Sequence, residues 1–279
     1  MNSDCALFAD DTKIFAPVSG HSDRNTLQID LDSLLDWTVA WQLPFNESKC
    51  KVIHYGKHNP HRMYTLGQNS VNSVVEEKDL GVTFDPSLNF SLHHDKAIAK
   101  ANSRLGLVKR SFRHLDEKSF ITLYKSLIRP ILEYSSVVTN PVRKQDQDRL
   151  ESVQRRATKL VPGLKDKPYG ERLKVLKIPS LKYRRKRCDV LQTYRILTKV
   201  DDLEETDFFT MRQEDRTRSN GFKIFKRQCR TKARANAFSQ RVVNNWNNLP
   251  KEVTTAPTVN RFKSALENHW QADPDKYLQ

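Results

Sequence analysis

The spacing of apolar residues changes at Pro86, and this change restricts the possible folds more than any other feature of the sequence. Before Pro86, short apolar and β-branched runs are typical of strands. Residues 23–43 instead predict a helix, whose apolar face is Leu27, Leu31, Leu34, Leu35 and Trp41. The predicted strands cover residues 51–55, 71–75 and 79–84. We therefore predict an α+β fold in which residues 1–90 form a small antiparallel sheet with one helix.

After Pro86 the apolar residues recur at helical spacing, which predicts a mostly α-helical remainder. Pro130 lies inside one of these helices and should kink or shorten it, because proline has no backbone N–H to donate. The predicted helices cover residues 92–113, 116–138, 145–161, 180–199, 236–247 and 259–270. We divide this part into a helical region, residues 91–163, and a basic helical C-terminal region, residues 164–279.

Charge is distributed unevenly along the chain. The sequence holds 48 Lys and Arg against 33 Asp and Glu, a net charge of +15. Residues 1–90 hold 7 basic and 12 acidic residues, a net charge of −5, so residues 91–279 carry +20. A basic body attracts polyanions, and nucleic acid is the commonest large one. We therefore predict a nucleic-acid partner, with a merely solubilising surface as the alternative.

Two stretches concentrate the positive charge. Residues 182–187 place five basic residues around one tyrosine, which indicates a nuclear import signal or a helix face that contacts phosphates. Between Arg216 and Arg234 there are eight basic residues and no acidic one, interleaved with Phe222 and Phe225. Such aromatic rings can stack on bases or simply pack against a neighbouring element. The predicted nucleic-acid contacts are Lys182, Arg184, Arg185, Lys186, Arg187, Lys223, Lys226, Arg227, Arg230, Lys232 and Arg234.

Residues 4–17 predict a strand, a tight turn and a second strand, with two adjacent aspartates at the tip. Adjacent carboxylates repel each other, and a bound cation relieves the repulsion. Metal-assisted phosphoryl transfer uses carboxylates in this way to hold Mg²⁺ ions. Taken alone, Asp10 and Asp11 leave two interpretations open, an ordinary solvated turn or a metal site.

The cysteines and the N-terminus indicate an intracellular protein. Cys5, Cys50, Cys188 and Cys229 lie far apart with no CxxC motif, which favours reduced thiols. No stretch is apolar enough for a membrane helix, so we expect no membrane partner. The first residues carry aspartates where a signal peptide needs an apolar run.

Several motifs together resemble the second half of the palm of a reverse transcriptase, specifically that of the non-LTR (LINE-type, jockey-like) retrotransposons. The first motifs are Phe8-Ala9-Asp10-Asp11, a helix, Phe45-Asn46 to Lys49-Cys50, and Asp79-Leu80-Gly81-Val82. Residues 123–134 and 150–158 are similar to the family's thumb, and residues 238–250 to its C-terminal region. The resemblance implies a partial palm over residues 1–90, a thumb over 91–163 and a C-terminal region over 164–279.

The resemblance also implies a function, RNA-directed DNA synthesis by a nucleotidyltransferase with Mg²⁺. The partners would be an RNA template and a DNA primer or target DNA. Asp10 would be a direct Mg²⁺ ligand and Asp11 a second carboxylate of the same site. Lys49 matches the lysine that assists the departing pyrophosphate, with an ordinary surface lysine as the alternative. Leu80 and Gly81 match the hairpin that grips the primer end.

The sequence departs from the family where the metal site should be completed. The family's palm has another metal-binding aspartate on an earlier strand, and only nine residues precede Asp10 here. We therefore expect a truncated polymerase that is inactive alone and located in the nucleus. The alternatives are a nucleic-acid-binding module without catalysis and a non-functional remnant.

Overall fold

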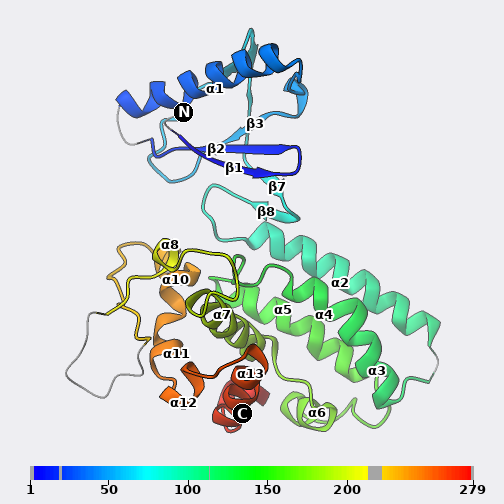
Figure 1. Ribbon diagram of the computed structural model, residues 1–279. Helices are drawn as coiled ribbons and strands as arrows, with labels where there is room; N and C mark the ends of the chain where they lie inside the picture. The colour runs from blue at the N-terminus through cyan, green and yellow to red at the C-terminus, as the bar shows by residue number, and fades with distance from the viewer. Residues whose placement is uncertain (1–2, 19–20, 113, 213–221, 278–279) are drawn as a thin grey trace. The chain divides into compact units, whose positions relative to one another are not determined.

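The computed structural model describes residues 3–18, 21–112, 114–212 and 222–277, with the backbone alone for residues 21–24. The chain divides into two compact units, residues 1–88 and residues 89–279 (Figure 1). The predicted division at residue 163 falls inside the second unit. Each unit is described by itself below.

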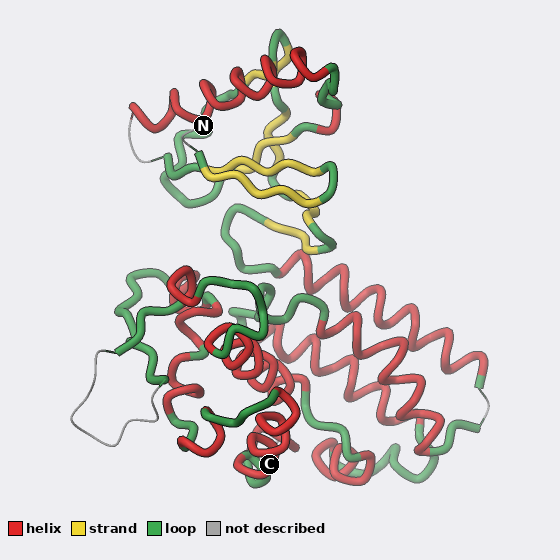
Figure 2. The backbone as a smooth tube through the Cα atoms, viewed as in Figure 1, coloured by secondary structure: helices red, strands yellow, loops and turns green. Residues whose placement is uncertain are grey.

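The N-terminal unit combines one long helix with short paired strands, and all the described strands lie before residue 85 (Figure 2). The elements are β1 (Asp4–Phe8), β2 (Asp11–Phe15), α1 (His21–Trp41), the 3₁₀ turn η1 (Glu47–Lys49), β3 (Lys51–Ile53), β4 (Thr65–Leu66), β5 (Asn69–Ser70), β6 (Asn72–Val74), β7 (Glu77–Asp79) and β8 (Val82–Phe84). With the helices that follow, they confirm the predicted mixture of helix and strand.

The prediction of one small antiparallel sheet is wrong for the described residues. The strands form four separate two-stranded ladders, and β3 and β6 run parallel. Strands of two or three residues offer few backbone groups for a further ladder, whereas β1 and β2, of five residues, are joined by a tight turn and pair only with each other in the described residues. The predicted single strand over residues 79–84 is also wrong, because Leu80 and Gly81 turn the chain with φ of 45° and 81°. Glycine adopts positive φ without steric cost, which allows this tight turn.

Helix α1 is held mainly by polar contacts. The Gln28 side chain donates to the Thr65 carbonyl at 2.9 Å and accepts from the Thr65 N–H at 3.0 Å, which ties α1 to β4. The predicted apolar face is partly buried, except that Trp41 is 65% exposed. That part of the prediction is wrong, because α1 ends at Trp41 and Gln42 turns the chain with φ of 53°.

The second unit is built from helices. They are α2 (Ser91–Ser111), α3 (Glu117–Leu123), the π-helical turn η2 (Tyr124–Ile128), α4 (Arg129–Glu133), α5 (Lys144–Ala157), the 3₁₀ turn η3 (Thr158–Leu160), α6 (Tyr169–Leu176), α7 (Leu181–Leu197), α8 (Glu205–Phe208), α9 (Lys232–Asn236), α10 (Phe238–Arg241), α11 (Val243–Asn247), α12 (Lys251–Thr254), α13 (Val259–His269) and α14 (Pro274–Tyr277). The sequence did not predict the short helices α6, α8, α9, α12 and α14.

The predicted break at Pro130 is confirmed. Proline cannot donate to the carbonyl of Ser126, four residues earlier, and the chain widens into η2 directly before α4. The helix then ends at Glu133, before the predicted residue 138, and Ser135 turns the chain with φ of 51°.

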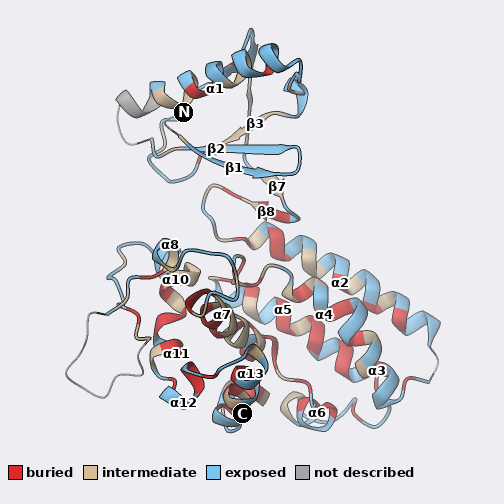
Figure 3. Ribbon diagram, in the orientation of Figure 1, coloured by how far each residue is buried: buried red, intermediate tan, exposed pale blue. Residues whose placement is uncertain are grey.

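Two apolar cores meet on α7. The first gathers side chains from α2, η2 and α5 and includes Leu181 at the start of α7. The second contains Tyr194 of α7, stacked on Phe262 with ring centres 4.1 Å apart, and the fully buried Trp246. Nine of the 17 residues of α7 are buried, so the helix lies inside the unit rather than on its surface (Figure 3).

Candidate nucleic-acid interface and acidic hairpin

The β1–β2 hairpin presents two adjacent carboxylates. The strands pair over their full length, with Asp4 opposite Phe15 and Phe8 opposite Asp11. Ala9 and Asp10 form the two-residue turn, and Ala9 has a φ of 53°. Asp10 and Asp11 are both exposed, and neither carboxylate has a hydrogen bond or ion pair to the residues that the structure describes.

The donor chemistry of this hairpin suits Mg²⁺, which proteins often bind with one or two carboxylates together with water and substrate phosphates. Within the described residues, no group of three or more His, Cys, Asp and Glu side chains could hold a metal ion. Asp10 and Asp11 could therefore hold Mg²⁺ only together with further ligands, such as water and substrate phosphates.

The other residues that the resemblance assigns to a palm lie on separate elements. Lys49 is exposed at the end of η1, and no contact joins it to either aspartate of the turn in the described residues. Leu80 and Gly81 form the β7–β8 turn, and Asp79 beside them pairs with Lys13 of β2. The structure thus links the acidic hairpin to the β7–β8 hairpin but not to Lys49.

The basic residues at 182–187 lie on α7 and have acidic partners. Lys182 Nζ lies 2.7 Å from Asp275 Oδ1. The guanidinium of Arg184 forms a two-point ion pair with Glu133, with 2.8 Å between Nη2 and Oε2. Paired guanidinium and carboxylate groups of this kind are among the stronger charge-assisted hydrogen bonds.

Two more cations of α7 are paired in the same way. Lys186 Nζ forms an ion pair with Asp273 and lies 4.7 Å from the centre of the Trp270 ring. Arg187 Nε lies 3.9 Å from Glu267 Oε2. Their partners come from the C-terminal helix α13 and the turn that follows it.

The remaining basic residue of this stretch, Arg185, is 6% exposed, and its Nη1 has no hydrogen-bond partner in the part of the chain that the structure describes. Burial lowers the pKa of its guanidinium, against the opposing effect of Glu151 and Asp189. Asp189, one turn further along α7, accepts from Arg241 Nε at 2.8 Å and from Nη2 at 2.6 Å. A phosphate contact by α7 stays a prediction, and it would require breaking these ion pairs.

The second basic stretch is arranged differently. Its exposed cations have no carboxylate partner among the described residues; they are Lys226, Arg227, Arg230, Lys232 and Arg234. Lys223 is half-buried and equally unpaired within that part of the chain. Arg216 and Arg218 lie outside the described residues.

Backbone contacts hold this stretch extended over the second core. Ile224 is 1% exposed, forms a bridge with Met211 and exchanges two hydrogen bonds with the Asn247 side chain, at 2.9 and 2.8 Å. Phe222 packs against the second core, whereas Phe225 is 50% exposed. Packing against a neighbouring element is therefore confirmed for Phe222, whereas base stacking by Phe225 stays a prediction.

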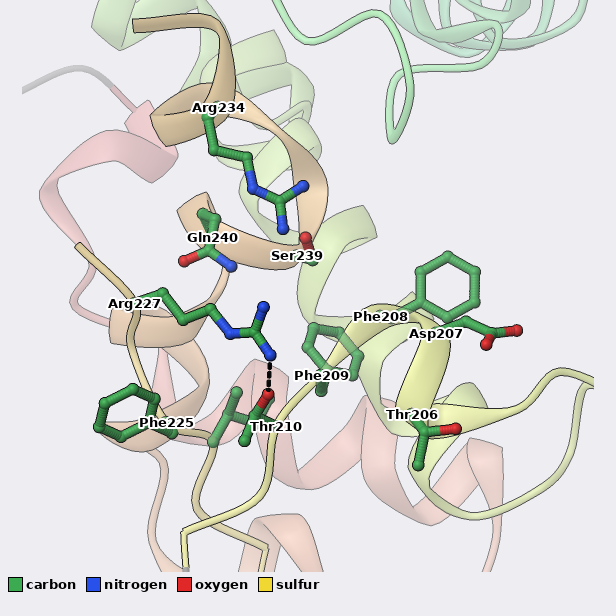
Figure 4. Close-up of a pocket in the computed structure, with 11 residues that line it drawn as sticks. Thr206, Asp207, Phe208, Phe209, Thr210, Phe225, Arg227, Arg234, Ser239 and Gln240 are labelled. Carbon is green, nitrogen blue, oxygen red and sulfur yellow. Dashed lines mark hydrogen bonds between the residues drawn. The ribbon is translucent and has the colours of Figure 1, made fainter. Parts of the chain in front are cut away.

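A shallow pocket lies beside the stretch, and the sequence did not reveal it. Its lining residues are Thr206, Asp207, Phe208, Phe209, Thr210, Ile224, Phe225, Arg227, Arg234, Ser239 and Gln240. Figure 4 shows the guanidinium groups of Arg227 and Arg234 pointing into the same space. The other side chains come from α8 and the two residues after it, from Ile224 and Phe225, and from α10. These segments lie apart in the sequence, so no local pattern predicts the pocket.

None of the described helices combines the length and apolarity needed to cross a bilayer. All four cysteines are free thiols. In comparisons with known proteins, no family model, no curated protein and no solved structure matches this chain.

Proposed function

We propose that the chain is a nucleic-acid-binding part of an RNA-directed DNA polymerase of the non-LTR retrotransposon type. Residues 1–88 would correspond to part of the palm, and residues 89–279 to the thumb and C-terminal region. The observation that supports binding most is the run of exposed cations between Lys226 and Arg234 that have no carboxylate partner among the described residues. Free cations can neutralise phosphates and release counterions without first losing a carboxylate partner.

Salt-dependent binding tests this proposal. If all five exposed cations of the second stretch reach phosphates, log K for duplex DNA falls against log[salt] with a slope of roughly −4 to −5. Fluorescence anisotropy of a labelled duplex and a labelled RNA, over a series of salt concentrations, gives the slope. A slope near zero for both probes would reject nucleic-acid binding and leave the non-functional remnant as the better description.

A pair of triple variants separates the two basic stretches. Replacing Lys226, Arg230 and Lys232 with Gln should flatten the slope by up to about 3, because each lost phosphate contact removes roughly 0.9. The matched control replaces three ion-paired cations of α7, Lys182, Lys186 and Arg187, with Gln and should leave the slope unchanged. If the α7 variant flattens the slope and the variant of Lys226, Arg230 and Lys232 does not, the interface lies on α7 instead.

The acidic hairpin supports a second candidate function, binding of a divalent cation. Two adjacent exposed carboxylates without a partner in the described chain form a weak oxygen-ligand site. Mn²⁺ should broaden the NMR signals of residues near Asp10 and Asp11, and Asp10→Asn should remove the effect. Asp32→Asn on the exposed side of α1 is the control. Equal broadening in Asp10→Asn would reject this site.

We expect no primer extension by the chain alone with Mg²⁺ or Mn²⁺. The resemblance implies a third metal-binding carboxylate, and the described residues bring none to Asp10 and Asp11. Loss of a metal contribution worth several kcal/mol slows the chemical step by orders of magnitude. Steady incorporation of deoxynucleotides that disappears in Asp10→Asn would show that the chain is a complete polymerase.

A further inference from the structure

The pocket beside α8 and α10 has the chemistry of an anion site. Arg227 and Arg234 both line it, and neither forms an ion pair within the described residues. Asp207 is the one carboxylate in the lining, and Figure 4 shows its side chain pointing away from the two guanidinium groups. Two like charges at one pocket repel each other, and an anion between them converts this repulsion into attraction.

Neighbouring polar groups hold the donors of the pocket in place. Arg227 Nη2 donates to Thr210 Oγ1 at 2.7 Å, which fixes one edge of its guanidinium. Gln240 is 5% exposed, and its Oε1 accepts a long hydrogen bond of 3.8 Å from Cys229 Sγ. The amide NH₂ of Gln240 therefore remains a donor on the other side, and in Figure 4 it points to the side of Gln240 on which Ser239 lies.

These donors match a phosphate group better than a carboxylate. A phosphate offers several oxygens, and planar guanidinium groups bind such oxygens in pairs. The pocket offers two guanidinium groups, one hydroxyl and one amide as donors. They can share the oxygens of a phosphate, whereas a carboxylate has only two oxygens to accept from them.

Phe225 indicates which phosphate compound the pocket receives. Its ring lines the same pocket and is 50% exposed, although Phe222 and Ile224 beside it pack inward. An exposed ring next to a phosphate can stack on the adjoining base, and only an unpaired strand offers a free base. We propose that this pocket binds a backbone phosphate of single-stranded nucleic acid, with Phe225 stacking on the neighbouring base; this rests on the proposed function above.

Binding of the full chain to a labelled oligouridylate, and to the same strand paired with oligoadenylate, tests the proposal. The double variant Arg227→Gln, Arg234→Gln should flatten the single-strand salt slope by about 1.4, because each phosphate contact on a single strand contributes roughly 0.7. The control, Lys251→Gln with Arg261→Gln, makes the same charge change at exposed positions of α12 and α13 and should leave the slope unchanged. Equal flattening by both double variants would overturn the phosphate site.

Two further variants test the geometry without removing charge. Phe225→Leu should weaken binding of oligouridylate roughly 5- to 100-fold and leave duplex binding unchanged, because stacking needs an unpaired base. Arg227→Lys with Arg234→Lys should keep the salt slope but weaken single-strand binding, because lysine lacks the planar fork. Equal weakening of both probes by Phe225→Leu would overturn the stacking role. Failure of the unaltered chain to bind either probe would instead reject the proposed function itself.

Discussion

Replacing His94 should remove an acid sensitivity that is built into the second unit. His94 lies in the first turn of α2 and is 3% exposed, and its Nε2 has no hydrogen-bond partner among the described residues. Burial lowers its pKa from 6.5 to about 4, with a further contribution from His93. Arg185 lowers this pKa as well, whereas Asp146 and Asp95 raise it.

The sign of the effect follows from the two pKa values. In the unfolded chain the histidine takes up a proton near pH 6.5, and in the folded chain it does so only near pH 4. The stabilisation is therefore complete above pH 6.5 and is lost as the pH falls towards 4. One pKa unit corresponds to 1.36 kcal/mol, so the free energy of unfolding falls by about 3 kcal/mol over this range.

Urea unfolding at a series of pH values measures this loss. The buried Trp246 and Trp270 lie in the same unit as His94, so their fluorescence follows its unfolding. His94→Leu should be at least as stable at neutral pH, since it removes an unpaired buried nitrogen, and should lose most of the acid sensitivity. His114→Gln, at an exposed position, should behave like the unaltered chain. A His94→Leu profile parallel to that of the unaltered chain would refute the reasoning.

Two stability predictions concern the same unit. Arg241→Gln should lower the free energy of unfolding by about 3–5 kcal/mol, because it leaves the buried Asp189 carboxylate without its ion-pair partner. Arg261→Gln is the control at an exposed position. Equal losses of stability in the two variants would disprove the role of the Arg241–Asp189 pair. Gly106→Ala should raise the free energy of unfolding by roughly 0.5–1 kcal/mol, since Gly106 lies in the interior of α2 with no atom within 4 Å of an added Cβ. A lower urea midpoint for Gly106→Ala would contradict that prediction.

The helices of the second unit could be predicted because their signal is local. The predicted ranges 92–113, 145–161 and 180–199 correspond to α2, α5 with η3, and α7, with ends that differ by a few residues. Strand pairing in the first unit depends on contacts between distant segments, such as that of β3 with β6. Apolar alternation carries no information about such partners, so the parallel ladder could not be foreseen.

The same distinction applies to the candidate interface. Both basic stretches look alike in sequence, but the carboxylate partners of the first lie far away along the chain. Asp275 is 93 residues from Lys182, and Glu133 is 51 residues from Arg184. The sequence alone therefore does not distinguish the cations between 223 and 234, which have no carboxylate partner among the described residues, from those of α7, whose charge is balanced by ion pairs.

The acidic hairpin has a consequence for the behaviour of the chain in concentrated solution. In the described chain β1 and β2 pair only with each other, so each leaves its outer backbone groups open to a new strand. Leu7 is 73% exposed and Phe8 62% exposed, which makes this edge apolar as well. Open apolar edges promote intermolecular strand addition. Purified material would therefore polymerise edge to edge as its concentration rises, and solubility rather than affinity would limit the concentrations that can be studied.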